Sequence, residues 1–109
     1  MIEEVLPNLY RMEIPLPQSP LKTLNSYLIK SPERSLIIDT GWNRDECHNE
    51  MMSTLGKLNV DLNQVDFFIT HGHPDHIGLV ARLSTANSAV YFNGLEGSIV
   101  NSDWHRDEL

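Results

Sequence analysis

The chain has 109 residues, which is enough for one small domain with a modest hydrophobic core. Hydrophobic residues make up 40% and charged residues 21% of the sequence, proportions typical of a soluble globular protein. The formal net charge of −7 and the lack of a Lys/Arg cluster argue against a general nucleic-acid binder, which needs a basic surface.

The N-terminal part of the chain predicts β-strands. Residues 9–14 alternate loosely and are rich in strand formers, whereas the three prolines within residues 15–22 predict a loop. Two short apolar runs, 24–29 and 36–39, flank a polar turn that contains Ser-Pro. Together these two runs predict a β-hairpin.

A helix is expected after this hairpin. Asn43 followed by Glu46 resembles an N-terminal capping pair, and Gly56 predicts the end of the helix. Apolar residues recur at helical spacing and predict one buried stripe, formed by Cys47, Met51, Leu55 and Leu58. We therefore interpret Cys47 as a small buried residue rather than a nucleophile.

The remainder of the chain alternates between strand and helix patterns. Residues 65–69 predict a buried strand, residues 76–84 a helix, and residues 89–92 a short strand. The side chains of this helix that should face the sheet are Ile77, Val80, Ala81 and Ser84. Residues 93–101 begin with a second capping pattern and predict a third helix. This alternation predicts an α/β fold with helices against a mixed sheet.

Four metal-capable side chains directly follow the strand of residues 65–69: His71, His73, Asp75 and His76. Imidazole nitrogen and carboxylate oxygen are the ligands that zinc and similar divalent metals prefer. In an extended segment His71 and His73 lie on the same side, and Pro74 lets the chain bend before the second pair. The pattern favours two adjacent metal ions over a purely structural turn.

Residues 70–78, Thr-His-Gly-His-Pro-Asp-His-Ile-Gly, resemble the Thr-His-x-His-x-Asp-His-x-Gly signature of the metallo-β-lactamase superfamily. Residues 36–41 resemble the strand and Asp-Thr-Gly element of that family, and the similarity runs in element order from about Leu9 to Phe92. The resemblance implies the N-terminal half of an αββα sandwich, a mixed sheet with flanking helices.

The resemblance also implies roles for individual residues. His71 and His73 would bind a first metal ion, and Asp75 and His76 a second, with Asp75 orienting the attacking hydroxide. Asp39 would be an outer carboxylate that fixes the orientation of a ligand. Its sequence context also allows another role, which is to cap the turn formed by the next two residues.

The activity implied is that of a metal-dependent hydrolase. Zinc, with two ions per complete site, is the expected cofactor, and iron or manganese is possible. A metal-activated hydroxide would attack an ester, thioester, amide or phosphodiester bond of a small-molecule substrate. Two alternatives remain: a di-iron redox relative of the same fold, or a non-catalytic fragment that only binds metal and self-associates.

The family's complete site needs further ligands from a C-terminal half that this sequence does not contain. His105 is not preceded by an apolar strand and is not expected to supply one of them. We therefore expect residues 1–109 to form a single, truncated domain. Apolar side chains of its strands would then lie in water and favour self-association, among them Leu28, Ile37, Phe67 and Ile69.

The expected location is the cytoplasm, without a membrane partner. Cys47 is the only cysteine and cannot form an intrachain disulfide, so no oxidising compartment is implied. Residues 1–4 lack the cationic and apolar regions of a signal peptide, and no apolar run is long enough to span a bilayer.

Overall fold

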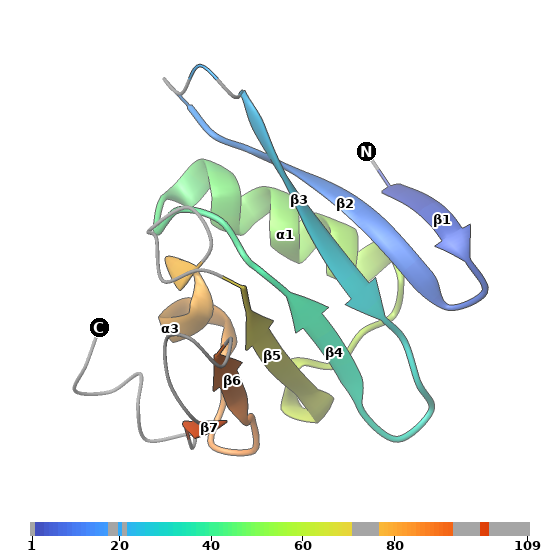
Figure 1. Ribbon diagram of the computed structural model, residues 1–109. Helices are drawn as coiled ribbons and strands as arrows, with labels where there is room; N and C mark the ends of the chain where they lie inside the picture. The colour runs from blue at the N-terminus through green and yellow to red at the C-terminus, as the bar shows by residue number, and fades with distance from the viewer. Residues whose placement is uncertain (1, 18–19, 21, 71–76, 93–98, 101–109) are drawn as a thin grey trace.

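The computed structural model describes residues 2–17, 20, 22–70, 77–92 and 99–100. These residues form a seven-stranded sheet whose strands lie side by side in chain order (Figure 1). The strands are β1 (Ile2–Leu6), β2 (Leu9–Pro15), β3 (Thr23–Ile29), β4 (Ser35–Ile38), β5 (Val65–Ile69), β6 (Val90–Phe92) and β7 (Ile99–Val100).

The sheet is mixed, as the sequence predicted. Strands β1 to β4 pair antiparallel, β4, β5 and β6 pair parallel, and β7 is antiparallel to β6. Helix α1 (Asp45–Lys57) and the 3-10 helix η1 (Leu62–Gln64) connect β4 to β5, and α3 (Val80–Leu83) precedes β6. A parallel pair needs such a crossover, since a short turn cannot bring the chain back to the same end. The α/β prediction and the hairpin of β3 and β4 are confirmed.

The core lies between the sheet and α1, which crosses behind β2 and β3 in Figure 1. Strand side chains alternate between faces, and the register aligns one row of them across the sheet toward the helices. This row comprises Tyr10, Leu28, Ile37, Phe67 and Val90. From the helix, Cys47, Met51 and Leu55 are buried against the sheet, which confirms these members of the predicted stripe, whereas Leu58 is the C-cap and is partly buried.

This packing corrects the expectation that apolar side chains of the strands would lie in water. The four residues named for that reason are fully buried, because they belong to the face that the helices cover: Leu28, Ile37, Phe67 and Ile69. Any self-association would therefore involve other residues.

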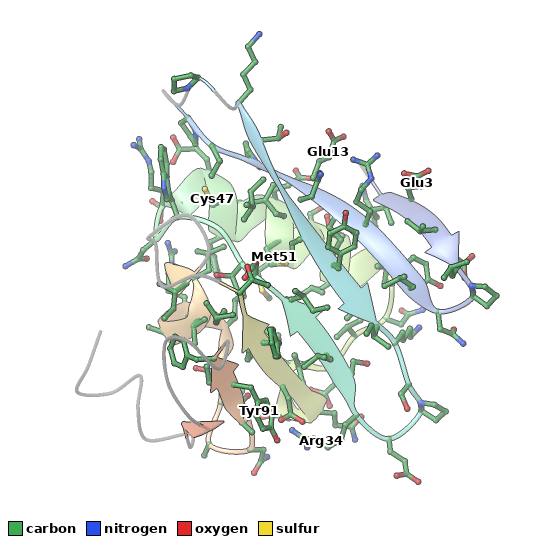
Figure 2. The ribbon with its side chains drawn as sticks, in the orientation of Figure 1. Glu3, Glu13, Arg34, Cys47, Met51 and Tyr91 are labelled. Carbon is green, nitrogen blue, oxygen red and sulfur yellow. The ribbon has the colours of Figure 1, made fainter. Side chains whose placement is uncertain are left out.

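Cys47 is a packing residue, as expected from its place in the apolar stripe. Its side chain is fully buried and its thiol donates to the Pro15 carbonyl, with Sγ and O 3.0 Å apart. Burial is the largest influence on the thiol and raises its pKa, which disfavours the nucleophilic thiolate. Figure 2 shows Cys47 and Met51 on α1.

The start and end of α1 differ from the prediction. The helix begins at Asp45, its N-cap is Arg44 without a side-chain capping bond, and so the predicted pair of Asn43 and Glu46 does not cap it. The helix continues through Gly56 to Lys57, and the left-handed residue after it is Asn59, with φ 57°. An asparagine tolerates this conformation well, so the glycine was not needed as the terminator.

The elements after β5 also differ in part. In the predicted helix 76–84, Ile77 is helical and packs partly buried against the core, and a turn at residues 78–79 separates it from α3. The buried side chains of α3 are Val80 and Leu83, whereas Ala81 and Ser84 are partly exposed. The predicted third helix of residues 93–101 is wrong at Ile99 and Val100, which form β7 beside β6, and its first six positions lie outside the described residues. Strand β1 was not predicted, because its two consecutive glutamates interrupt the alternation.

No helix among the described residues has the length and apolar character that crossing a membrane requires.

An ion pair between Arg34 and Asp66 links β5 to the residue before β4, at the end of the sheet opposite Asp39. The Asp66 carboxylate accepts bonds from Arg34 at 2.7 and 3.1 Å and from the Ala89 N–H at 2.9 Å. The bond from Arg34 is the main reason that the pKa of Asp66 lies below its ordinary value, although partial burial opposes it. Figure 2 shows Arg34 near Tyr91 at this end of the sheet.

We expect Asp66→Asn to lower the free energy of unfolding by about 1 kcal/mol at pH 7, a value that allows for the exposure of Arg34. A carboxylate with a lowered folded pKa stabilises above its unfolded pKa of 3.8, and this contribution is lost as pH falls through the folded value. Urea unfolding should therefore show a difference in unfolding free energy between wild type and Asp66→Asn at about pH 7 that becomes smaller at about pH 3. An equal difference at both pH values would contradict this assignment.

Candidate metal centre

The candidate centre lies where β4 and β5 end side by side. Open α/β sheets bind ligands at the carboxyl ends of their parallel strands. Asp39 directly follows β4 and Thr70 directly follows β5. The Asp39 N–H donates to the Phe68 carbonyl at 2.9 Å, which continues the parallel pairing by one residue. The two residues are thereby held opposite each other across the strand ends.

The Asp39 carboxylate binds Thr70 with both of its oxygens. Oδ1 accepts from the Thr70 N–H at 2.8 Å, and Oδ2 accepts from the Thr70 hydroxyl at 2.6 Å. Asp39 is only 6% exposed, so these charge-assisted bonds are protected from competing water. This carboxylate thus fixes the backbone at the residue immediately before His71. The contact shows that Asp39 reaches beyond the local turn at Thr40 and Gly41. Its role as an outer carboxylate of a metal site stays a prediction.

The backbone of Asp39 is in the left-handed region, with φ 61°. Few non-glycine residues adopt this conformation, and aspartate is among those that tolerate it. The fully buried Ser26 supports it from β3, because its hydroxyl lies 2.7 Å from the Asp39 carbonyl oxygen and 3.3 Å from the Ile38 carbonyl oxygen. The turn that aims the Asp39 carboxylate at Thr70 is therefore anchored to a neighbouring strand.

The two residues after Asp39 contact the chain on the other side of the histidine cluster. The Leu79 N–H lies 3.2 Å from the Thr40 hydroxyl oxygen and 3.1 Å from the Gly41 carbonyl oxygen. Gly41 has φ 128° and packs so closely that a Cβ there would lie 3.1 Å from Ile14 Cγ2 and 3.4 Å from Leu79 Cδ1. Glycine is required here by both conformation and space.

The structure thus places one of the predicted site residues, Asp39, and the immediate flanks of the others. The four predicted metal ligands lie outside the described residues: His71, His73, Asp75 and His76. His105 also lies outside them. In the part of the chain that the structure describes, no group of three or more His, Cys, Asp or Glu side chains could hold a metal ion. The liganding roles of the cluster therefore remain predictions.

Sequence reasoning missed Ser26 and the contact between Thr40 and Leu79. One signal could have found Ser26: it occupies a buried position in an alternating strand, between Leu24 and Leu28, where an apolar residue is expected. A buried hydroxyl needs a partner, and the following strand end offers carbonyl oxygens. The Thr40 contact spans 39 residues and depends on how the crossover returns, which no local pattern encodes.

Similar proteins of known sequence carry related names. The chain is 35% identical over 86 residues to the lactamase-like protein ptaB of Pestalotiopsis fici, and 34% identical over 86 residues to an atrochrysone carboxyl ACP thioesterase of Claviceps purpurea. Each match covers 75% of this chain and 26% of the relative. The chain thus spans about a quarter of the length of these relatives.

Solved structures show the same arrangement of elements. A metallo-beta-lactamase family protein from Thermus thermophilus matches with a TM-score of 0.68 and 32% identity, over 73% of this chain and 27% of that one. The metallo-beta-lactamase GOB-18 from Elizabethkingia meningoseptica shares the fold, with a TM-score of 0.64 and 23% identity over 83% of this chain and 31% of that one. The model of the Metallo-beta-lactamase superfamily matches residues 22–105. The chain therefore belongs to the metallo-beta-lactamase superfamily, and its fold matches part of the fold of that family.

Proposed function

We propose that this chain carries the strand-end ligands of a zinc-dependent hydrolase, with a thioester as the preferred substrate class. The observation that carries the proposal is the pair of bonds from Thr70 to the buried Asp39 carboxylate. These bonds fix the strand end from which the sequence His-Gly-His-Pro-Asp-His follows at once. Two relatives named as ACP thioesterases support the choice of thioester over amide or phosphodiester.

The residues present fit zinc in their donor chemistry. Three imidazoles and one carboxylate lie within residues 71–76, and these are the nitrogen and oxygen donors that zinc takes. His71 and His73 would hold one ion, and Asp75 and His76 a second. Bound zinc would activate water at neutral pH and polarise the bond to be broken.

The contribution of the chain's own residues is positional and electrostatic. Asp39 holds Thr70 in place, so the backbone enters the ligand segment from a fixed point. The carboxylate of Asp75 would orient the attacking water and accept its proton. Outer carboxylates of this kind keep ligands in the geometry that the ion requires, and their loss weakens binding or activity about 10–100-fold.

The test is hydrolysis of a matched substrate panel by the complete natural polypeptide that carries this chain, before and after zinc removal. We expect zinc-dependent cleavage of an acyl thioester, with slower cleavage of the corresponding oxygen ester, amide and phosphodiester. His73→Ala should abolish this activity, whereas His48→Ala should retain it, because His48 lies on α1 and is not one of the predicted ligands. Cleavage that persists without zinc, or that His73→Ala leaves intact, would overturn the proposal.

A further inference from the structure

We infer that Thr40 and Ser26 are positioning residues for the ligand segment, an inference that rests on the proposed metal site. The segment Asp39–Thr40–Gly41 acts as a clamp that holds the chain on both sides of residues 71–76. Asp39 holds the N-terminal flank through Thr70, and Thr40 holds the C-terminal flank through Leu79. Ser26 anchors the clamp itself to β3.

The contact between Thr40 and Leu79 lies where it can fix the start of the next helix. Leu79 is fully buried and is the N-cap of α3, so its carbonyl accepts the N–H of Arg82 and of Leu83 at 3.0 Å each. Its own N–H lies between the Thr40 hydroxyl oxygen and the Gly41 carbonyl oxygen. Thr40 is also fully buried, which makes its bond costly to lose. A fixed Leu79 fixes the start of the helix that follows the ligand segment.

The anchor at Ser26 keeps the clamp in its unusual conformation. Without the 2.7 Å bond from the Ser26 hydroxyl, the Asp39 carbonyl would lose a buried partner beside a left-handed backbone. A relaxation of that backbone would move the Asp39 carboxylate and the Thr40 hydroxyl together, because the two residues are adjacent. One buried serine on β3 thereby influences both flanks of the ligand segment.

The consequence for metal binding follows from ligand placement. Fixing the residues on both sides of a ligand segment lowers the ordering cost that metal binding would otherwise carry. A purely structural role for Thr40 predicts only lower stability. The positioning role predicts, in addition, weaker metal binding in protein that is still folded.

The experiment uses cobalt(II) as the probe, because its visible absorption reports ligand geometry whereas zinc is colourless. Wild type is compared with Thr40→Val, which removes the hydroxyl at similar size, and with Thr40→Ser, which keeps it. Thr54→Val is the matched control, because Thr54 is another buried threonine, 2% exposed, on α1. Amide hydrogen exchange at Leu79 in the metal-free protein is measured alongside.

We expect folded Thr40→Val to bind cobalt(II) about tenfold more weakly, with an altered absorption band and faster exchange at Leu79. Thr40→Ser should restore all three properties, and Thr54→Val should leave them unchanged. If Thr40→Val does not fold, Ser26→Ala decides, because it loosens the same clamp without touching Leu79. If folded Thr40→Val binds cobalt(II) as tightly as wild type, the inference is overturned but the proposed metal site is not. Where Thr40→Val does not fold, the same result in Ser26→Ala overturns the inference. A wild-type chain that binds no cobalt(II) would overturn the proposed site and the inference together.

Discussion

Replacing Asp39 with alanine is expected to lower the free energy of unfolding by about 2–4 kcal/mol, because the Thr70 N–H and hydroxyl would each lose a buried acceptor. Alanine also tolerates the left-handed backbone at this position less well than aspartate does, which adds to the loss. In the protein that still folds, zinc affinity should fall about tenfold or more, since the strand end before His71 is no longer fixed. Urea unfolding and zinc titration measure the two effects.

A matched series of variants separates the effect of losing the Asp39 carboxylate from the effect of its backbone conformation. Asp39→Asn keeps one oxygen acceptor and the tolerance of positive φ, so it should be less destabilised than Asp39→Ala. Asp45→Ala removes the same charge from a side chain that is 86% exposed and should change stability by less than about 1 kcal/mol. Combining Asp39→Ala with Thr70→Val should cost less than the sum of the two single changes. Additive costs would show that the two side chains do not depend on each other.

Local patterns predicted those parts of the fold that depend on periodicity. The alternation of β3 and the apolar run of β5 are both found as strands, and the helical spacing of Cys47, Met51 and Leu55 is found as the buried stripe of α1. In each case the residues that satisfy the pattern also face the core, so local preference and tertiary packing agree. The family resemblance also implied a mixed sheet with flanking helices.

Other features depend on contacts between distant residues and could not be predicted. Strand β1 is stabilised by pairing with β2, including a bond from Arg11 to Glu3, which local alternation does not reveal. Residues Ile99 and Val100 pair with β6 as a strand, although the sequence before them resembles a helix start. Pairing partners override weak local preference in short elements of this kind.

In the candidate site, too, a sequence motif could be recognised, whereas contacts between separate elements could not be predicted. The family resemblance identified Asp39 as a candidate site residue, because the Asp-Thr-Gly element of the motif includes it. It did not reveal that Thr40 contacts Leu79 or that Ser26 contacts Asp39, because each contact joins residues from separate elements. The chemistry of a site is thus more visible in a sequence than the residues that position it.

Loss of His73 is expected to have the largest effect on zinc binding. We expect the 109-residue chain alone to bind zinc weakly, through the cluster in residues 71–76, because this cluster offers only four side-chain ligands for two ions. Outer partners of metal ligands contribute about 10–100-fold to affinity, so a direct ligand should contribute at least about tenfold. His73→Ala should therefore bind zinc at least about tenfold more weakly than wild type.

Calorimetric titration of zinc into wild type, His73→Ala and His48→Ala tests the metal centre most directly. His48 is the matched control, because it is a partly buried histidine on α1 outside the predicted ligand set, with a pKa that burial chiefly lowers. The account predicts zinc binding by wild type and by His48→Ala, and a loss in His73→Ala. Equal binding by all three proteins, or binding by none, would contradict it.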